Sequence, residues 1–383
     1  MKIAQITTSI NGGAGLAAKR LSQALTHVGL DSRVVTQRSE VNETSVKSKI
    51  VTVLQDRFVQ SGPELVTTFS KTLINQDVLS SFEIIHFHGT YNLINTKDLI
   101  ELSKVRRIVL TLHDQRMITG GCHYSKDCNQ FRSSCEKCPQ VRMPFQYFVH
   151  KERESTKALS RSKNVYIVSP SNWLAQLATS TSDLGNPVKV IHNPVPELDF
   201  PVMVNEDVRI ARNQGKYIIG FVSAHLNNPF KGTQDLIQAF RRLPTEVLKQ
   251  VHLVIVGKGE VPHGLDFIAK TVISNFDEDT QSNPYKLMDL LVVPSREDNS
   301  PNVIGEALMS NVKVLGSLSG GIPEILELFG CPVVDATDPA KFAEKLIMEI
   351  NQKQIENYYP LARETFGYES IGNQMSEFYE SCL

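Results

Sequence analysis

Acidic side chains and glycine amides follow two neighbouring apolar runs in the second half of this sequence. Carboxylates bind sugar hydroxyls, and bare backbone amides at the start of a helix bind phosphate. A ligand with hydroxyls at one end and phosphates at the other, such as a nucleotide sugar, suits that combination. The acids and glycines are Glu297, Asp298, Glu306, Gly320 and Gly321.

The two apolar runs must position these groups. Residues 290–293 and 312–315 have the unbroken apolar pattern of buried parallel strands. The pattern predicts strand, loop and helix twice in succession, with helices starting near 302 and at Pro323. Open α/β sheets bind ligands outside the carboxyl ends of their strands. We therefore expect the acids and the glycines to share one edge of a sheet.

Two histidines stand at comparable positions in the first half of the chain. The runs at 83–88 and 107–113 predict strands that end at His88 and His113. A single histidine is more often structural than chemical. Two at equivalent strand ends favour a functional role for His113 and leave the role of His88 open.

A glycine-rich turn separates the first predicted strand, 2–7, from an amphipathic helix at 16–28. Such a turn frees amides for an anion or a sugar, although Gly13 and Gly15 could equally allow tight packing. The turn is not the GxGxxG fingerprint, and no acid follows at the spacing that a dinucleotide ribose needs. A plain Rossmann oxidoreductase is therefore disfavoured.

Four of the six cysteines lie within one segment, with the spacing C-x5-C-x6-C-x2-C. In a chain without an export signal, structural zinc is a better interpretation than disulfides, and His123 could replace one ligand. Free thiols or a redox-labile loop are the alternatives. The candidate ligands are Cys122, Cys128, Cys135 and Cys138.

Length and composition limit the class of protein. The 383 residues are enough for two domains, and the net charge of −1 gives no reason to expect nucleic acid. Without an apolar run of 18 residues or a signal peptide, we expect a cytoplasmic protein. The helix predicted at 144–160 carries Lys151 and Arg153. A solvated face is the favoured interpretation, with peripheral membrane contact at the inner face as the alternative.

The alternation of strands and helices predicts an α/β fold with two Rossmann-like domains. The expected N-terminal domain spans 1–196 and the C-terminal domain spans 215–360. The prolines and scattered charges between them indicate a linker at 197–214. The last segment, 361–383, is predicted to be a helix that packs back on the N-terminal domain.

These features together resemble the retaining glycosyltransferases of family 4, which have the GT-B architecture of two Rossmann-like doubly wound domains facing a central cleft. The resemblance covers nearly the whole chain and is strongest at 290–327, where Pro294-Ser295 and Glu306-Ala307 match the family pattern. The segment at 113–140, with its TGGCHY and CPQ runs, is similar to bacterial exopolysaccharide and lipopolysaccharide transferases of the colanic-acid type.

The resemblance implies roles for the acids and amides. Glu306 would bind the ribose hydroxyls of the nucleotide. Asp298, eight positions earlier, or its neighbour Glu297 would bind hydroxyls of the donor sugar. Backbone amides would meet the sugar and the diphosphate at Ser300 to Val303, which includes Asn302, and at Gly320 to Ile322.

The resemblance also implies where the cations and the first domain act. Lys231 would hold the diphosphate. The family arginine six residues earlier is replaced by His225, so either His225 is protonated in the complex or Lys258 compensates. His113 would lie near the donor sugar. The turn at Gly13 to Gly15 would approach the donor phosphate and the acceptor.

The implied reaction is retaining transfer of a hexose from a UDP- or GDP-linked donor to a glycan or polyprenyl-linked acceptor, with no metal required for catalysis. Domain closure about the linker would exclude water. A GT-B epimerase or phosphorylase is one alternative. A non-catalytic nucleotide-binding scaffold is another, and His225 is the only residue that favours it. The sequence leaves the oligomeric state open.

Overall fold

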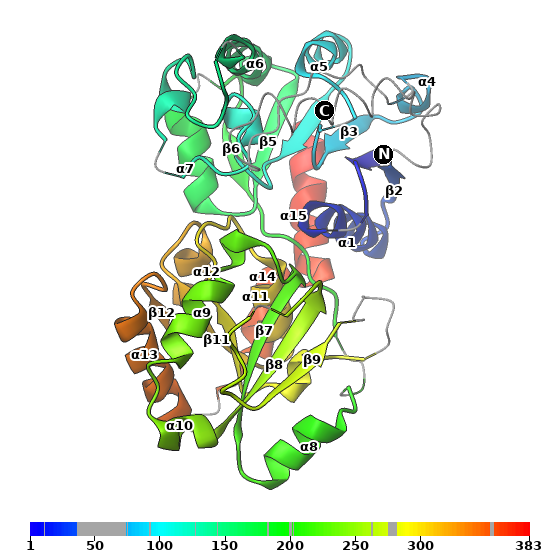
Figure 1. The fold of residues 1–383 in the computed structure, drawn as a ribbon. Helices are drawn as coiled ribbons and strands as arrows, with labels where there is room; N and C mark the ends of the chain where they lie inside the picture. The colour runs from blue at the N-terminus through cyan, green and yellow to red at the C-terminus, as the bar shows by residue number, and fades with distance from the viewer. Residues whose placement is uncertain are drawn as a thin grey trace. The chain divides into compact units, whose positions relative to one another are not determined.

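The computed structural model describes residues 1–10, 12–36, 74, 76–91, 93–126, 128–143, 145–181, 184–198, 201, 203–261, 263–274, 282–352 and 356–383. The chain divides into two compact units (Figure 1). The first unit contains Met1–Pro194 and Tyr368–Leu383, and the second contains Val195–Gly367. No helix within the described ranges has both the length and the apolar content to cross a bilayer.

The first unit is built on a six-stranded sheet in the order β2-β1-β3-β4-β5-β6, in which every described pairing is parallel. Its central strands are short and almost fully buried, as expected of a parallel sheet covered on both faces. The strands are β1 Lys2–Thr7, β2 Asp31–Thr36, β3 Ile84–Phe87, β4 Ile108–Thr111, β5 Val165–Ser169 and β6 Val188–Val190.

Helices cover both faces of this sheet. One face packs against Leu99 and Leu174, and the other against Leu21 and Leu25. The helices are α1 Gly13–His27, α4 Gln76–Leu79, α5 Thr96–Ser103, η2 Arg116–Ile118, η3 Gln130–Arg132, α6 Gln146–Ser160, α7 Asn172–Thr181 and α15 Tyr368–Ser381.

The C-terminal helix α15 completes the first unit. It lies against α1, with Gly372 so close to the carbonyl of Ala24 that a Cβ there would be 2.6 Å from the oxygen (Figure 1). Ile371 and Met375 are each 1% exposed in the same core as β1. The last helix therefore supplies side chains to the core under the sheet.

The second unit repeats the plan with the strand order β12-β11-β10-β7-β8-β9, again parallel in every described pairing. The register aligns Val293 with Gly316, so β10 and β11 end side by side. The strands are β7 Tyr217–His225, β8 Val251–Lys258, β9 Lys270–Ile273, β10 Leu290–Val293, β11 Lys313–Ser317 and β12 Val333–Val334.

Helices cover both faces of the second sheet as well. Asn205 and Asp338 cap two of them through side-chain bonds to backbone amides, which satisfies donors that a helix start leaves open. The helices are α8 Glu206–Asn213, η4 Pro229–Lys231, α9 Thr233–Phe240, α10 Thr245–Lys249, η5 Tyr285–Leu287, α11 Asn302–Met309, α12 Ile322–Leu328, α13 Pro339–Asn351 and α14 Tyr359–Phe366.

The boundaries differ from the sequence expectation at two places. The range 197–214, expected to be a linker, contains α8, which buries Val208 and Ala211 in the core of the second unit. The segment 361–383, expected to be one helix, divides at Gly367, and residues before it belong to α14 of the second unit. Residues 40–80, whose sequence has only a weak pattern and predicts mostly helix and polar loop, lie mostly outside the described residues.

Candidate active site

Three loops meet at the carboxyl edge of the second sheet. The loop after β7 leads through η4, the loop after β10 begins at Pro294, and the loop after β11 contains the paired glycines. The amide of Arg296 donates to the carbonyl of Phe230 at 2.7 Å, and the amide of Gly321 donates to the carbonyl of Asp298 at 3.0 Å. The loop after β10 is thus fastened to both neighbours, at the edge where ligands bind.

Lys231 and Asp298 form an ion pair within this group of loops. Nζ of Lys231 lies 2.5 Å from Oδ2 of Asp298, with the side chains 29% and 12% exposed. Oγ of Ser295 donates to the same carboxylate oxygen at 3.4 Å. The structure thus pairs Lys231 with Asp298, and the neighbouring Glu297 is half-buried. It brings together a cation and an acid that lie 67 positions apart.

Two glycines allow the loops to approach one another. Gly232 and Gly320 both have left-handed backbones, with φ of 71° and 63°. A Cβ at Gly232 would overlap the carbonyl oxygen of Pro294, and one at Gly320 would overlap that of Asp298. Gly320 therefore lies directly against the residue that binds Lys231.

Gly320→Ala tests this close contact, and Gly330→Ala is its matched control. Gly330 has a φ of 62°, but no described atom lies within 4 Å of its Cβ position. We expect Gly330→Ala to cost about 1–2 kcal/mol from left-handed strain alone. Gly320→Ala should cost about 2–4 kcal/mol, because the backbone of Asp298 must also move. Equal losses in urea unfolding would show that the loops are not interlocked.

Glu306 lies in α11, at the same end of the sheet. Its side chain is buried, with the residue 7% exposed, and Oε2 accepts a hydrogen bond from the hydroxyl of Tyr285. Asn302 and Val303 form the first turn of this helix and are half-buried. The predicted ribose acid thus lies in the helix that directly follows the loop carrying Asp298.

His225 ends β7 and is exposed. The register of β7 and β8 sets Lys258 opposite His225, so a lysine does lie beside the position where the resemblance expects arginine.

Several polar residues of this edge were not singled out from the sequence. Arg296 makes a two-pronged ion pair with Asp235 on α9, at 2.7 and 2.8 Å. Ser317 donates to the carbonyl of Ser295 at 2.6 Å and so joins the ends of β10 and β11. These bonds connect residues more than 20 positions apart, so no local pattern indicates them.

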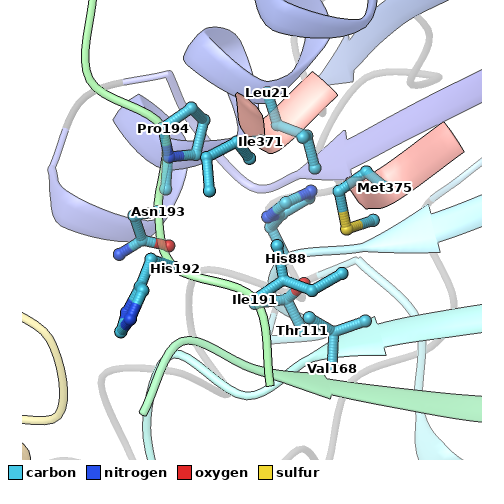
Figure 2. A pocket seen from close by; sticks show the side chains of 11 residues that line it. Leu21, His88, Thr111, Val168, Ile191, His192, Asn193, Pro194, Ile371 and Met375 are labelled. Atoms are coloured by element: carbon cyan, nitrogen blue, oxygen red, sulfur yellow. The ribbon is translucent and has the colours of Figure 1, made fainter. Parts of the chain in front are cut away.

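In the first unit, the two strand-end histidines contact each other. Nδ1 of His88 lies 2.9 Å from Nε2 of His113. Burial lowers the pKa of His113 to about 4, although the carboxylate of Asp114 raises it; burial also lowers the pKa of His88. Figure 2 shows His88 beside Leu21 and Met375. These residues line a small cavity of about 10 Å³. Because burial lowers the pKa of both His88 and His113, both rings are neutral near pH 7.

The glycine turn precedes α1. Gly13 is the first residue of the helix, and no described atom lies within 4 Å of its Cβ position. A Cβ at Gly15 would overlap the carbonyl oxygen of Ser9. Tight packing therefore explains Gly15, whereas Gly13 has room beside it.

The cysteine segment folds into its own small core. Cys122, Cys135 and Cys138 are buried beside Phe131 and Val149, and Cys128 is half-buried. Burial raises the pKa of the Cys135 thiol to about 11 and raises those of Cys122 and Cys138.

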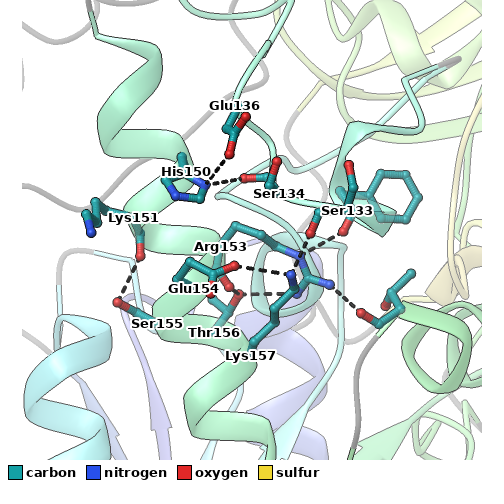
Figure 3. Close-up of polar contacts among 12 residues, drawn as sticks. Ser133, Ser134, Glu136, His150, Lys151, Arg153, Glu154, Ser155, Thr156 and Lys157 are labelled. Atoms are coloured by element: carbon teal, nitrogen blue, oxygen red, sulfur yellow. Dashed lines mark hydrogen bonds and ion pairs between the residues drawn. The ribbon is translucent and has the colours of Figure 1, made fainter.

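Helix α6 holds this segment in place, as Figure 3 shows. Arg153 is 0% exposed and donates to the carbonyls of Phe131 and Thr181 at 2.8 and 2.5 Å. The expectation that Arg153 lies on a basic outer face is therefore wrong, because its guanidinium satisfies buried carbonyls. Lys151, by contrast, is exposed.

Zinc binding by the cysteine segment stays a prediction. In the described parts of the chain, no three His, Cys, Asp or Glu side chains are placed to hold one metal ion. The four thiols gather in one region, but Nδ1 of His123 instead accepts a hydrogen bond from Nη2 of Arg116 at 2.8 Å. Zinc analysis of the purified protein is the direct measurement of that expectation.

Comparison with known proteins places this geometry in context. The family model of group 1 glycosyl transferases matches residues 216–351, which include β7 to α13 and the residues at the carboxyl edge of the second sheet. WcaC of Escherichia coli (strain K12), named as a colanic acid biosynthesis glycosyl transferase, is 22% identical over 92% of each chain.

Solved structures share the fold over the full length. Sucrose-phosphate synthase from Thermosynechococcus elongatus superposes with a TM-score of 0.66 at 16% identity, covering 99% of this chain and 98% of that one. Anabaena HepE in complex with UDP-glucose gives 0.65 at 17% identity, covering 100% of both. The chain therefore has the GT-B fold and carries a group 1 glycosyltransferase domain, and we conclude that it is a glycosyltransferase.

Proposed function

We propose that the second unit binds a nucleoside-diphosphate sugar, UDP- or GDP-linked, and that the protein transfers its hexose with retention to a glycan or polyprenyl-linked acceptor. The observation that carries this proposal is the interlocked group of Lys231, Asp298 and Gly320 at the carboxyl edge of the sheet. It combines one cation for phosphate and one acid for sugar hydroxyls with a glycine turn packed directly against them.

The comparisons support the donor and the pathway in this proposal. HepE has been solved with UDP-glucose, and WcaC is named for colanic acid biosynthesis. We therefore propose a role in surface polysaccharide synthesis.

The chemistry follows from where charge develops. As the glycosidic bond breaks, negative charge grows on the leaving phosphate oxygen, so a fixed cation there stabilises the transition state more than the ground state. Nζ of Lys231, held by Asp298 at 2.5 Å, would supply that charge without rearrangement of the loop. Glu306 would accept from ribose hydroxyls, and the amides near Asn302 and at Gly320 would donate to the sugar and phosphates.

A donor screen tests the proposal. Wild-type protein is incubated with UDP-glucose, UDP-N-acetylglucosamine and GDP-mannose without acceptor, and release of UDP or GDP is measured. We expect slow hydrolysis of one donor, with NMR showing that the sugar first appears with the anomeric configuration of the donor. Release of the opposite anomer would contradict retention. An epimerised sugar, a requirement for phosphate, or binding without turnover would instead indicate an epimerase, a phosphorylase or a scaffold.

We also propose that the protein works in the cytoplasm at the inner face of the membrane. Around the start of α6, Met143, Tyr147 and Phe148 are 76%, 59% and 44% exposed. Lys151 lies over the ring of Tyr147, with Nζ 5.4 Å from its centroid. Aromatic rings beside a lysine suit an anionic lipid surface.

Vesicle sedimentation tests that contact. Exposed side chains that become buried in lipid contribute roughly 1.5–3 kcal/mol each. The double variant Tyr147→Ser, Phe148→Ser should therefore bind anionic vesicles at least ~10-fold more weakly. Val105→Ser, at a residue that is 77% exposed, is the control and should bind like wild type. Equal vesicle binding by wild type, the double variant and Val105→Ser would show that Tyr147 and Phe148 do not contact the membrane.

A further inference from the structure

A chain of buried hydrogen bonds leads from the first strand to His113. Nε2 of His88 lies 2.7 Å from Oε1 of Gln5, and Nδ1 of His88 lies 2.9 Å from Nε2 of His113. Gln5 is 0% exposed and His88 is 3% exposed. Because each ring nitrogen of a neutral histidine is either a donor or an acceptor, the bond at one end of this chain decides the bond at the other.

The orientation of the Gln5 amide sets the direction of the chain. Its Nε2 has two neighbours, Oη of Tyr379 at 3.0 Å and Oγ of Ser32 at 3.5 Å, which can accept its two hydrogens. The opposite orientation would direct Nε2 at His88 alone and leave a buried amide hydrogen without an acceptor among the described residues, which is costly. Oε1 therefore faces His88 and can only accept.

The proton positions then follow in order. Nε2–H of His88 donates to Oε1 of Gln5, so Nδ1 of His88 carries a lone pair. That lone pair accepts from Nε2–H of His113. Nδ1 of His113 is then unprotonated, and no hydrogen bond joins it to any residue that the structure describes, while the ring is half-buried.

A second branch of the network agrees with this direction. Tyr379 accepts from Gln5, so its hydroxyl hydrogen is directed to Nδ1 of His86, 2.6 Å away. Nε2–H of His86 then donates to Oγ of Thr111 at 2.7 Å. Gln5, Tyr379 and His86 thus each have an acceptor in this branch, and the C-terminal helix, through Tyr379, is part of the network.

We propose that Gln5 and His88 are positioning residues that hold His113 as the Nε2–H tautomer, so that its Nδ1 accepts a hydrogen bond from a sugar hydroxyl. The identity of that hydroxyl rests on the function proposed above, whereas the tautomer does not. Burial lowers the pKa of all three histidines, to about 3 for His86 and about 4 for His113, which keeps the rings neutral near pH 7.

The tautomer is measured on the intact protein by ¹⁵N NMR of the histidine rings, and the signals of His113 are identified as those lost in His113→Gln. We expect Nε2 of His113 to be protonated and Nδ1 to have the shift of an unprotonated nitrogen. A protonated Nδ1 in wild type overturns the proposal, whatever the activity of the enzyme.

Two substitutions of His88 test whether the tautomer matters for turnover. His88→Phe keeps a ring but removes the acceptor for His113, and we expect kcat for donor cleavage to fall of order 10-fold, with a mixed tautomer at His113. His88→Asn keeps a donor toward Gln5 and an acceptor toward His113, and should restore the Nε2–H signal and most of kcat. Unchanged kcat in His88→Phe, or no recovery in a folded His88→Asn, would overturn the positioning role.

Discussion

We expect Lys231→Ala to lower kcat for donor cleavage by about 100-fold or more. A fixed donor aimed at developing oxyanion charge contributes about 2.7–4 kcal/mol to the barrier, and each 1.36 kcal/mol is tenfold in rate. Nζ of Lys231 is a cation at the junction of three loops, 2.5 Å from Asp298. Initial rates of nucleoside-diphosphate release measure the effect.

The control for Lys231→Ala is Lys249→Ala. Lys249 also forms an ion pair, with Glu246 at 3.1 Å, but both side chains are at least 66% exposed on the surface of the same unit. This variant should keep the wild-type rate, because exposed pairs contribute little. Full turnover in a folded Lys231→Ala protein would show that the diphosphate does not bind at this lysine.

Glu306→Ala should weaken nucleoside-diphosphate binding by about 10- to 100-fold. Hydrogen bonds to a charged group contribute about 1.5–3 kcal/mol each, and a ribose offers two hydroxyls to one carboxylate. The carboxylate is largely buried, so in the alanine variant water would be a poor substitute for it as the hydrogen-bond acceptor of the ribose. Titration calorimetry with UDP and GDP measures the dissociation constants.

A structural role for Glu306 is separated from ribose binding by Tyr285→Phe. The hydroxyl of Tyr285 donates to Oε2 of Glu306, and its removal leaves the carboxylate in place. We expect Tyr285→Phe to bind nucleotide within about threefold of wild type. If Tyr285→Phe and Glu306→Ala weakened nucleotide binding equally, Glu306 would stabilise the fold through Tyr285 and would not contact the ribose.

The fold was predictable because its strands are locally encoded. The run at 290–293 is β10, and the run at 312–315 overlaps the first three residues of β11. The glycines after β11 stand where the chain must turn against Asp298. Parallel strands then bring their carboxyl ends to one edge, so the meeting of the acid loop and the glycine loop follows from topology.

The site details were not predictable, because they depend on long-range contacts. Spacing could not choose between Glu297 and Asp298, whereas the structure pairs Lys231 with Asp298. Nor could a helical pattern show that Arg153 turns inward to bind carbonyls of two other segments. The alternation in the strand at 83–88 did carry a signal for His86, which lies on the same face as His88.

Titration calorimetry of UDP and GDP on the wild-type protein and on Lys231→Ala tests the donor site most directly. We expect one nucleoside diphosphate to bind wild type with one site per chain, and Lys231→Ala to bind it at least ~10-fold more weakly while both proteins bind the parent nucleoside equally. The absence of binding to wild type, or equal affinity of both proteins for the diphosphate, would contradict a donor site at this edge of the second sheet.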